Sequence, residues 1–99
     1  MLNAIKRTAL ACAMYVNYPT ITDEQKDALI SELEFYAMLL ETEKRGNLAE
    51  LAQSTSKLAY ATIAYLKNRT ISNKQTALEV VNETADLLIK FDEKSVINN

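Results

Sequence analysis

The chain has 99 residues, enough for one hydrophobic core, so we expect a single domain over residues 1–99. Hydrophobic residues make up 48% and charged residues 24%, and the single Gly and single Pro favour helices over turn-rich β folds. One Cys and no His exclude an internal disulfide and the usual zinc sites, and a net charge of −2 lacks the basic excess typical of phosphate binding. This cysteine usage predicts a cytoplasmic protein, and no apolar run approaches the roughly 18 residues of a membrane span.

The first half of the chain predicts two helices. One covers Leu2–Val16 and ends where a Pro follows at residues 17–19. Thr22 and Gln25 then form a capping box, in which each side chain accepts a hydrogen bond from a free backbone N–H of the helix start. The second helix begins there, and its apolar positions recur with helical spacing at Leu29, Ile30, Leu33, Tyr36, Ala37 and Leu40.

The second and third predicted helices meet at a short turn. We expect the second helix to run to about Arg45 and Gly46 to form its left-handed C-cap. Asn47, with Glu50 three residues later, is the expected N-cap of the third helix, which ends near Lys67.

The fourth predicted helix opens with a second capping box, formed by Ser72 and Gln75, and its regular part extends to about Lys94. Its expected inner face consists of Leu78, Val81, Ala85, Leu88 and Phe91. The sequence therefore predicts an all-α fold, a small four-helix bundle.

A repeat with a spacing of fifty residues suggests how the helices pair. Tyr15, Thr20-Ile21-Thr22 and Gln25 recur as Tyr65, Thr70-Ile71-Ser72 and Gln75. We predict two helical hairpins, residues 1–46 and 47–99, related by an internal duplication. The alternative is that helix starts share a small vocabulary of capping residues.

Two of the predicted helices are apolar on all sides. Residues 9–16 are all apolar, and residues 58–66 are apolar apart from Thr62, whereas the second and fourth helices each carry one apolar stripe. The same two helices are basic, and the other two are acidic. A bundle of this size has too few other residues to bury two all-apolar helices on all sides. We therefore expect self-association into a homo-oligomer through the first and third helices.

The sequence offers few catalytic groups, and we predict that the protein is not an enzyme and uses no cofactor or metal. Cys12 lies in an apolar helix, where a thiol is inert. Glu79, Glu83 and Asp86 share one face of the fourth helix, and Glu83-Thr84-Ala85-Asp86 resembles the Glu-x-x-Asp element of the all-α nucleoside triphosphate pyrophosphohydrolases. That resemblance implies a magnesium-dependent enzyme, with a site between this face and the carboxylates Glu32, Glu41 and Glu43 of the second helix. The adjacent Glu pair of the family is absent from this sequence, and the alternative is a solvated acidic face.

Aromatic and basic residues gather near the ends of the first and third helices. The residues that we predict to contact a partner are Tyr15, Tyr18, Tyr60, Tyr65, Lys67 and Arg69. Aromatic residues beside bases can bind single-stranded nucleic acid or a small anionic ligand, although the acidic balance disfavours nucleic acid. Tyrosine is also enriched at protein interfaces.

These features favour a small helical protein-binding accessory protein that occupies a surface on another protein. Inhibitors, including phage-encoded inhibitors of host enzymes, immunity proteins and regulatory subunits have this size and architecture. The two alternatives are the magnesium-dependent pyrophosphohydrolase and the binder of single strands or small anions.

Overall fold

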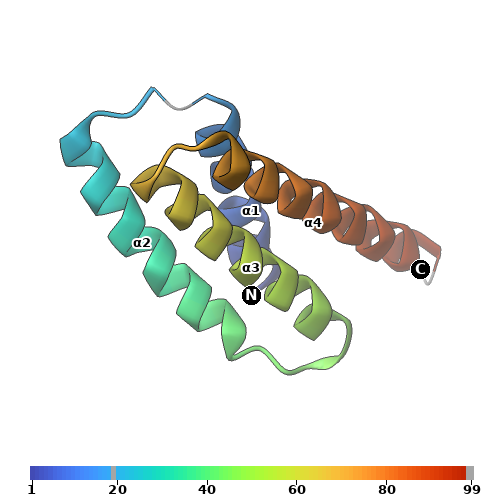
Figure 1. Ribbon diagram of the computed structural model, residues 1–99. Helices are drawn as coiled ribbons and strands as arrows, with labels where there is room; N and C mark the ends of the chain where they lie inside the picture. The colour runs from blue at the N-terminus through green and yellow to red at the C-terminus, as the bar shows by residue number, and fades with distance from the viewer. Residues whose placement is uncertain (19, 98–99) are drawn as a thin grey trace.

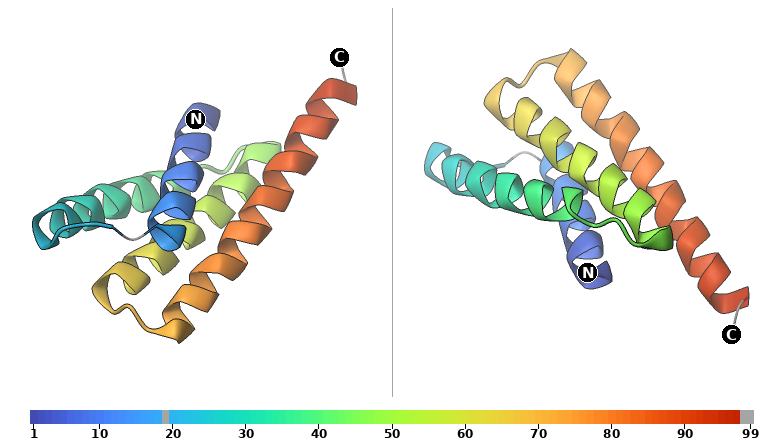
Figure 2. Two further views of the ribbon diagram at one scale, coloured as in Figure 1. Left: turned by 90° about the horizontal axis from the view of Figure 1, so that it is seen from above. Right: turned by 90° about the horizontal axis from the view of Figure 1, so that it is seen from below.

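The computed structural model describes residues 1–18 and 20–97, without the side chains of residues 47 and 94–97, and these residues form an all-α four-helix bundle. The helices are α1 (Leu2–Asn17), α2 (Asp23–Glu41), α3 (Gly46–Lys67) and α4 (Ile71–Ile97). Figure 1 shows α3 between α2 and α4, and Figure 2 shows α1 crossing the bundle at a steep angle. In the described part of the chain α2 and α4 make no contact with each other, so α3 is the central helix.

The core lies where the four helices meet. Its largest cluster of buried residues is Ala9, Cys12, Ile30, Leu33, Ala37, Leu58, Ala59, Ile63, Leu66 and Val80. The predicted apolar stripe of α2 is confirmed, since Ile30, Leu33, Ala37 and Leu40 are buried. Most of the apolar stretch 58–66 of α3 is buried inside the chain against α1, α2 and α4, while Tyr60 is 41% exposed and Ala64 is exposed. Little of this stretch is therefore left for a partner molecule, and the expected self-association through α3 stays a prediction.

Buried hydroxyl groups on α3 allow this close packing without unsatisfied polar atoms. The Thr55 and Thr62 hydroxyls each donate to the carbonyl oxygen four residues earlier, at 2.8 Å. The Ser56 hydroxyl donates to the Ala37 carbonyl oxygen of α2 at 2.8 Å, and the Ser54 hydroxyl lies 2.8 Å from that of Thr84 in α4. Every buried side-chain nitrogen or oxygen of the described residues has a partner. The small hydroxyl residues thus link α3 to both neighbours.

Ion pairs connect the basic helices with the acidic ones. Lys6 of α1 lies 3.5 Å from Asp92 of α4, and Lys57 of α3 lies 3.4 Å from Glu83 of α4. Lys67 of α3 lies 3.8 Å from Glu34 of α2. The alternation of charge read from the sequence therefore corresponds to neighbouring helices, with exposed pairs that each contribute little to stability.

The first capping box is confirmed. The Thr22 hydroxyl accepts a hydrogen bond from the Gln25 backbone N–H, and the Gln25 side chain accepts one from the Thr22 backbone N–H. Pro19, expected to follow the end of the preceding helix, lies outside the described residues.

The turn between α2 and α3 differs from the prediction. Helix α2 ends at Glu41 rather than near Arg45, and the Glu43 carboxylate accepts hydrogen bonds from the backbone N–H and the guanidinium of Arg45 at 3.0 and 3.1 Å. Gly46 has a φ of +45°, but it is the first residue of α3 and not the C-cap of α2. Arg45, and not Asn47, occupies the N-cap position of α3. A carboxylate that holds the backbone of the turn thus replaces the expected helical turn.

The start of α4 also differs from the prediction. The Thr70 hydroxyl, rather than that of Ser72, accepts the capping hydrogen bond, which comes from the Asn73 backbone N–H at 3.0 Å. The Asn73 side chain also donates to the Asn68 carbonyl oxygen at 2.8 Å, which ties the helix start to the end of α3. At the other end, α4 continues to Ile97.

The inner face of α4 is rotated relative to the predicted one. Ala77, Val80 and Thr84 are buried, whereas the predicted Ala85 is exposed. The other predicted positions are partly buried: Leu78, Val81, Leu88 and Phe91. Helix α4 contacts both α1 and α3, and its buried Val80 belongs to the core cluster that these helices share.

Candidate protein-binding groove

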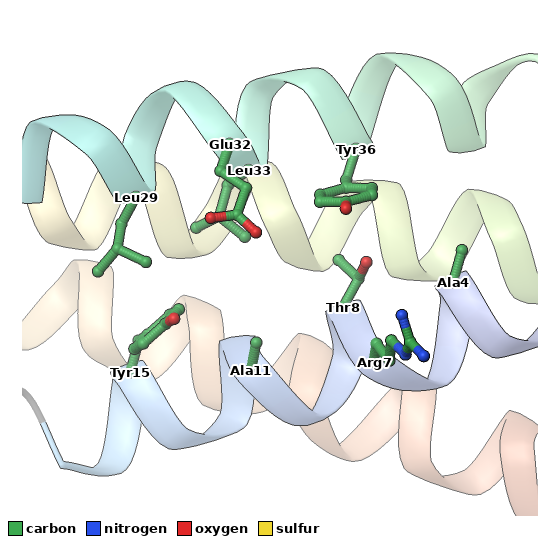
Figure 3. Close-up of a pocket in the computed structure, with 9 residues that line it drawn as sticks. All are labelled: Ala4, Arg7, Thr8, Ala11, Tyr15, Leu29, Glu32, Leu33 and Tyr36. Carbon is green, nitrogen blue, oxygen red and sulfur yellow. The ribbon is translucent and has the colours of Figure 1, made fainter.

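A groove separates α1 from α2. It consists of two adjoining cavities of about 310 and 510 Å³, which share Tyr15, Leu29 and Glu32, and we call it the α1–α2 groove. Figure 3 shows the first cavity, with side chains of the two helices pointing toward one another. Its lining residues are Ala4, Arg7, Thr8, Ala11, Tyr15, Leu29, Glu32, Leu33 and Tyr36.

Small residues on the α1 wall keep the groove open. Ala4, Thr8 and Ala11 present short side chains where α2 presents Leu29 and Tyr36. At the same time α1 packs more closely on α3 and α4 than on α2. The space between α1 and α2 is therefore not filled by side chains of this chain.

Large apolar side chains are exposed on both helices that form the groove. On α1, Leu10 is 65% exposed and Met14 54%. On α2, Phe35 is 63% exposed, and its ring packs edge-on against that of Tyr36 with the centroids 5.5 Å apart. Leu39 lies one turn further along α2 and is 38% exposed. Met14 lines the second cavity, and the other three lie on the same two helices outside both cavity linings. We call these four residues the groove rims, and such exposed apolar side chains are typical of an interaction surface.

The groove contains few charges. Arg7 and Glu32 are the two charged side chains among the described lining residues, one on each helix, and they form no ion pair with each other. Partial burial, and then the nearby Glu32 carboxylate, raises the pKa of the Tyr15 phenol. Tyr15 is therefore neutral and able to donate a hydrogen bond at physiological pH. The groove is apolar with a few placed polar groups, as binding sites generally are.

The residues predicted to contact a partner do not form one site. Tyr15 lines both cavities, and Tyr18, which is 74% exposed, lines the second. Tyr60 and Lys67 face a different side of α2, where Tyr60 hydrogen-bonds to Glu41 and Lys67 pairs with Glu34.

The last two predicted residues lie away from the groove. Tyr65 is only 5% exposed and packs in the core against Val16 and Ala77, so it is not available to a partner. Arg69 is exposed in the turn between α3 and α4. Of the aromatic and basic residues at the end of α3, Tyr65 is therefore unavailable to a ligand, whereas Lys67 and Arg69 are exposed.

Sequence reasoning missed the contribution of α2 to the groove. Phe35 and Leu39 lie four residues apart and outside the buried stripe of α2, which is a signal that the sequence contains. The single apolar stripe predicted for this helix leaves no apolar residues for its other face. The structure shows that part of this face is apolar.

The carboxylates do not converge as the pyrophosphohydrolase resemblance requires. Glu79, Glu83 and Asp86 are exposed on α4, and Glu83 pairs with Lys57. The carboxylates of α2 lie on a helix that α4 does not touch. Among the described residues no group of three or more His, Cys, Asp or Glu side chains could hold a metal ion. The described residues therefore do not form the arrangement on which this alternative depends.

The only thiol is shielded from solvent. Cys12 is fully buried, and burial raises the pKa of its thiol to about 11, against a smaller opposing effect of its hydrogen bond with Thr62. The thiol is therefore protonated at neutral pH, as expected for a cysteine that serves as a small core residue.

Comparison with known proteins gives no relative. The chain matches no family of proteins, no curated protein and no solved structure. Within the described residues, none of the helices has the length and apolar character needed to cross a membrane.

Proposed function

We propose that the protein is a small helical accessory protein, of the inhibitor, immunity or regulatory type, that acts by binding another protein through the α1–α2 groove. The observation that supports the proposal is the apolar groove with exposed Leu10, Met14, Phe35 and Leu39 on its rims. Covering these side chains removes apolar surface from water, which provides the main favourable term in protein association.

The shape of the groove suits a helical segment of the partner. Two helices form its walls, and an amphipathic helix placed over them can insert side chains between the rims. Such a segment would be apolar where it meets the rims, with polar groups that match Arg7, Glu32 and the Tyr15 hydroxyl.

Site-specific photo-crosslinking tests this proposal. A photoreactive amino acid replaces Met14 on the groove rim or, as a matched control, Ile89 on α4, which is 56% exposed and lines neither cavity. After irradiation in cells of the native host, mass spectrometry identifies the crosslinked proteins. We expect a defined partner crosslinked from position 14 and not from position 89.

A second variant connects the crosslink to the groove itself. The double substitution Leu10→Ser and Phe35→Ser removes apolar surface from both rims at exposed positions. It should abolish the crosslink from position 14 while circular dichroism shows unchanged helix content. Equal crosslinking from positions 14 and 89, or a crosslink that survives the double substitution, would refute the proposal.

A further inference from the structure

Thr8 differs from the other buried threonines of the bundle. The Thr55 and Thr62 hydroxyls each donate to the carbonyl oxygen four residues earlier. Thr8 is only 5% exposed, yet its hydroxyl has no hydrogen-bond partner in the described part of the chain. Because every fully shielded side-chain oxygen of the described residues has a partner, the Thr8 hydroxyl must open onto a cavity. That cavity is the first one of the α1–α2 groove, where Figure 3 shows Thr8 and Tyr36 pointing toward one another.

Further polar groups without partners line the same cavity. The Arg7 guanidinium and the Tyr36 hydroxyl lie at the same end as Thr8. The Glu32 carboxylate and the Tyr15 hydroxyl lie toward the other end, where the first cavity adjoins the second. None of these four side chains forms a hydrogen bond or an ion pair with another described residue. Buried or half-buried polar groups normally have partners, so this set indicates a place for the polar groups of a ligand.

The wall between the two polar ends is apolar. Ala11 and Leu33 lie there, and Leu29 points toward Tyr15 (Figure 3). The cavity measures about 310 Å³, at the lower end of the range of about 300–1,000 Å³ that is typical of small-molecule sites. Its occupant is therefore a small molecule with an apolar body.

The two ends favour different groups of such a molecule. A guanidinium donates two parallel hydrogen bonds to a carboxylate, and the neighbouring hydroxyls of Thr8 and Tyr36 supply further donors. The Glu32 carboxylate instead attracts a protonated amine. A ligand with a single charge would pair with one of Arg7 and Glu32 and be repelled by the other, whereas a ligand with both charges matches both.

We propose that the first cavity binds a small zwitterion. Its carboxylate lies against Arg7, Thr8 and Tyr36, its amine lies against Glu32, and its apolar body lies between them. This site goes beyond the proposed function, because none of the four groove-rim residues lines the first cavity.

A titration of the ¹⁵N-labelled chain followed by NMR tests the site. The probes are straight-chain ω-amino acids of about four to eight carbon atoms, a size that a cavity at the lower end of the range accepts. Each is compared with the alkanoate and the alkylamine of the same length. We expect an ω-amino acid to shift the backbone amide signals of the cavity walls on α1 and α2. Its affinity should be at least about tenfold higher than that of either analogue with a single charge.

Three substitutions assign the groups that bind each end. Glu32→Gln should remove the preference for the ω-amino acid over the alkanoate, and Arg7→Gln should remove its preference over the alkylamine. Thr8→Val removes the hydroxyl with little change in shape, and it should weaken binding of the ω-amino acid at least about threefold. The melting temperature of this variant should not fall, because the hydroxyl has no partner in the described chain to lose.

Matched substitutions outside the groove control for the loss of a charge. Glu79→Gln and Lys90→Gln alter exposed residues of α4 that line neither cavity, and they should leave binding unchanged. The proposal is overturned if no ω-amino acid shifts the amide signals at about 10 mM. Equal affinity for an ω-amino acid and its two analogues, or preferences that survive both Glu32→Gln and Arg7→Gln, also overturns it.

The rim substitutions separate this inference from the proposed function. The double substitution Leu10→Ser and Phe35→Ser changes no residue that lines the first cavity, so it should leave binding of the ω-amino acid intact. A chain that crosslinks a partner from position 14 but binds no ω-amino acid refutes this inference and supports the proposed function. A chain that binds the ω-amino acid and crosslinks no protein supports this inference and refutes the proposed function.

Discussion

The central position of α3 predicts a large difference between two identical substitutions. Leu58 on α3 is 1% exposed in the main core cluster, whereas Leu10 on α1 is 65% exposed. Leu58→Ala removes three buried carbon atoms, which corresponds to about 2.4 kcal/mol at about 0.8 kcal/mol each. The cavity that remains raises the expected loss of unfolding free energy to about 3–4 kcal/mol. Leu10→Ala should change it by less than about 0.5 kcal/mol.

Urea denaturation followed by circular dichroism measures both effects. With a slope of about 1–2 kcal/mol per M for a domain of this size, Leu58→Ala should lower the midpoint by about 2 M. The measurement must be made at a protein concentration at which the chain is monomeric, because an association that covers the exposed Leu10 would change the apparent free energy of unfolding. A loss below about 1 kcal/mol for Leu58→Ala, or equal losses at both positions, would contradict the placement of α3 inside the bundle.

Three further predictions concern individual side chains. Thr70→Ala should lower the unfolding free energy by about 1 kcal/mol, and Ser72→Ala should have little effect, because the Thr70 hydroxyl caps α4; equal losses in urea titrations would restore Ser72 as the cap. Hydrogen bonds from Arg45 lower the pKa of the Glu43 carboxyl. Their stabilisation is therefore complete above the ordinary value of about 4.3 and is lost as the pH falls through the lower folded pKa. The melting temperature of the wild type should exceed that of Glu43→Gln at about pH 5, and this difference should shrink as the pH falls to about 3, where the carboxyl becomes protonated. A difference that does not change with pH would show that the ion pair with Arg45 does not cause it. The Cys12 thiol should react with a disulfide reagent at pH 8 at least about a hundredfold more slowly in the native protein than in urea, since its pKa rises from 9.0 to about 11; similar rates would mean that Cys12 is accessible.

Local signals in the sequence predicted much of the fold. The Thr22 capping box and the apolar stripe of α2 depend on residues three or four positions apart, and both are present as predicted. The expected boundaries of α1 and the end of α3 also agree with the structure to within a residue. These features follow from helix geometry alone, and a sequence displays them without reference to the rest of the chain.

Competing local signals explain the errors at the helix ends. Thr70 and Ser72 are both good capping residues, and the side chain of Asn73 favours the earlier one through its hydrogen bond to Asn68, in the turn that follows α3. Gly46 can adopt a positive φ both as the C-cap of α2 and as the first residue of α3, so its presence does not distinguish the two positions. The choice depends on how Glu43 holds Arg45, which is a contact that the spacing of residues does not specify. The fifty-residue duplication remains a prediction, and its two helix starts are capped at positions that do not correspond.

The candidate site depends on the positions of helix axes, which explains why the sequence indicated it only in part. An all-apolar helix fits equally the centre of a bundle and an interface between chains. Helix α3 lies at the centre of the bundle, and α1 combines buried residues with the exposed Leu10 and Met14. Tyr15 and Tyr65 have equivalent places in the repeat, yet one lines the groove and the other lies in the core. The difference follows from the inclination of α1 toward α4, where Lys6 meets Asp92. That inclination leaves α2 without a neighbour along one side, so the surplus apolar surface of α1 faces a second apolar surface across a gap. An occupant of the groove must therefore satisfy both helices together, and a substitution on either rim should weaken its binding.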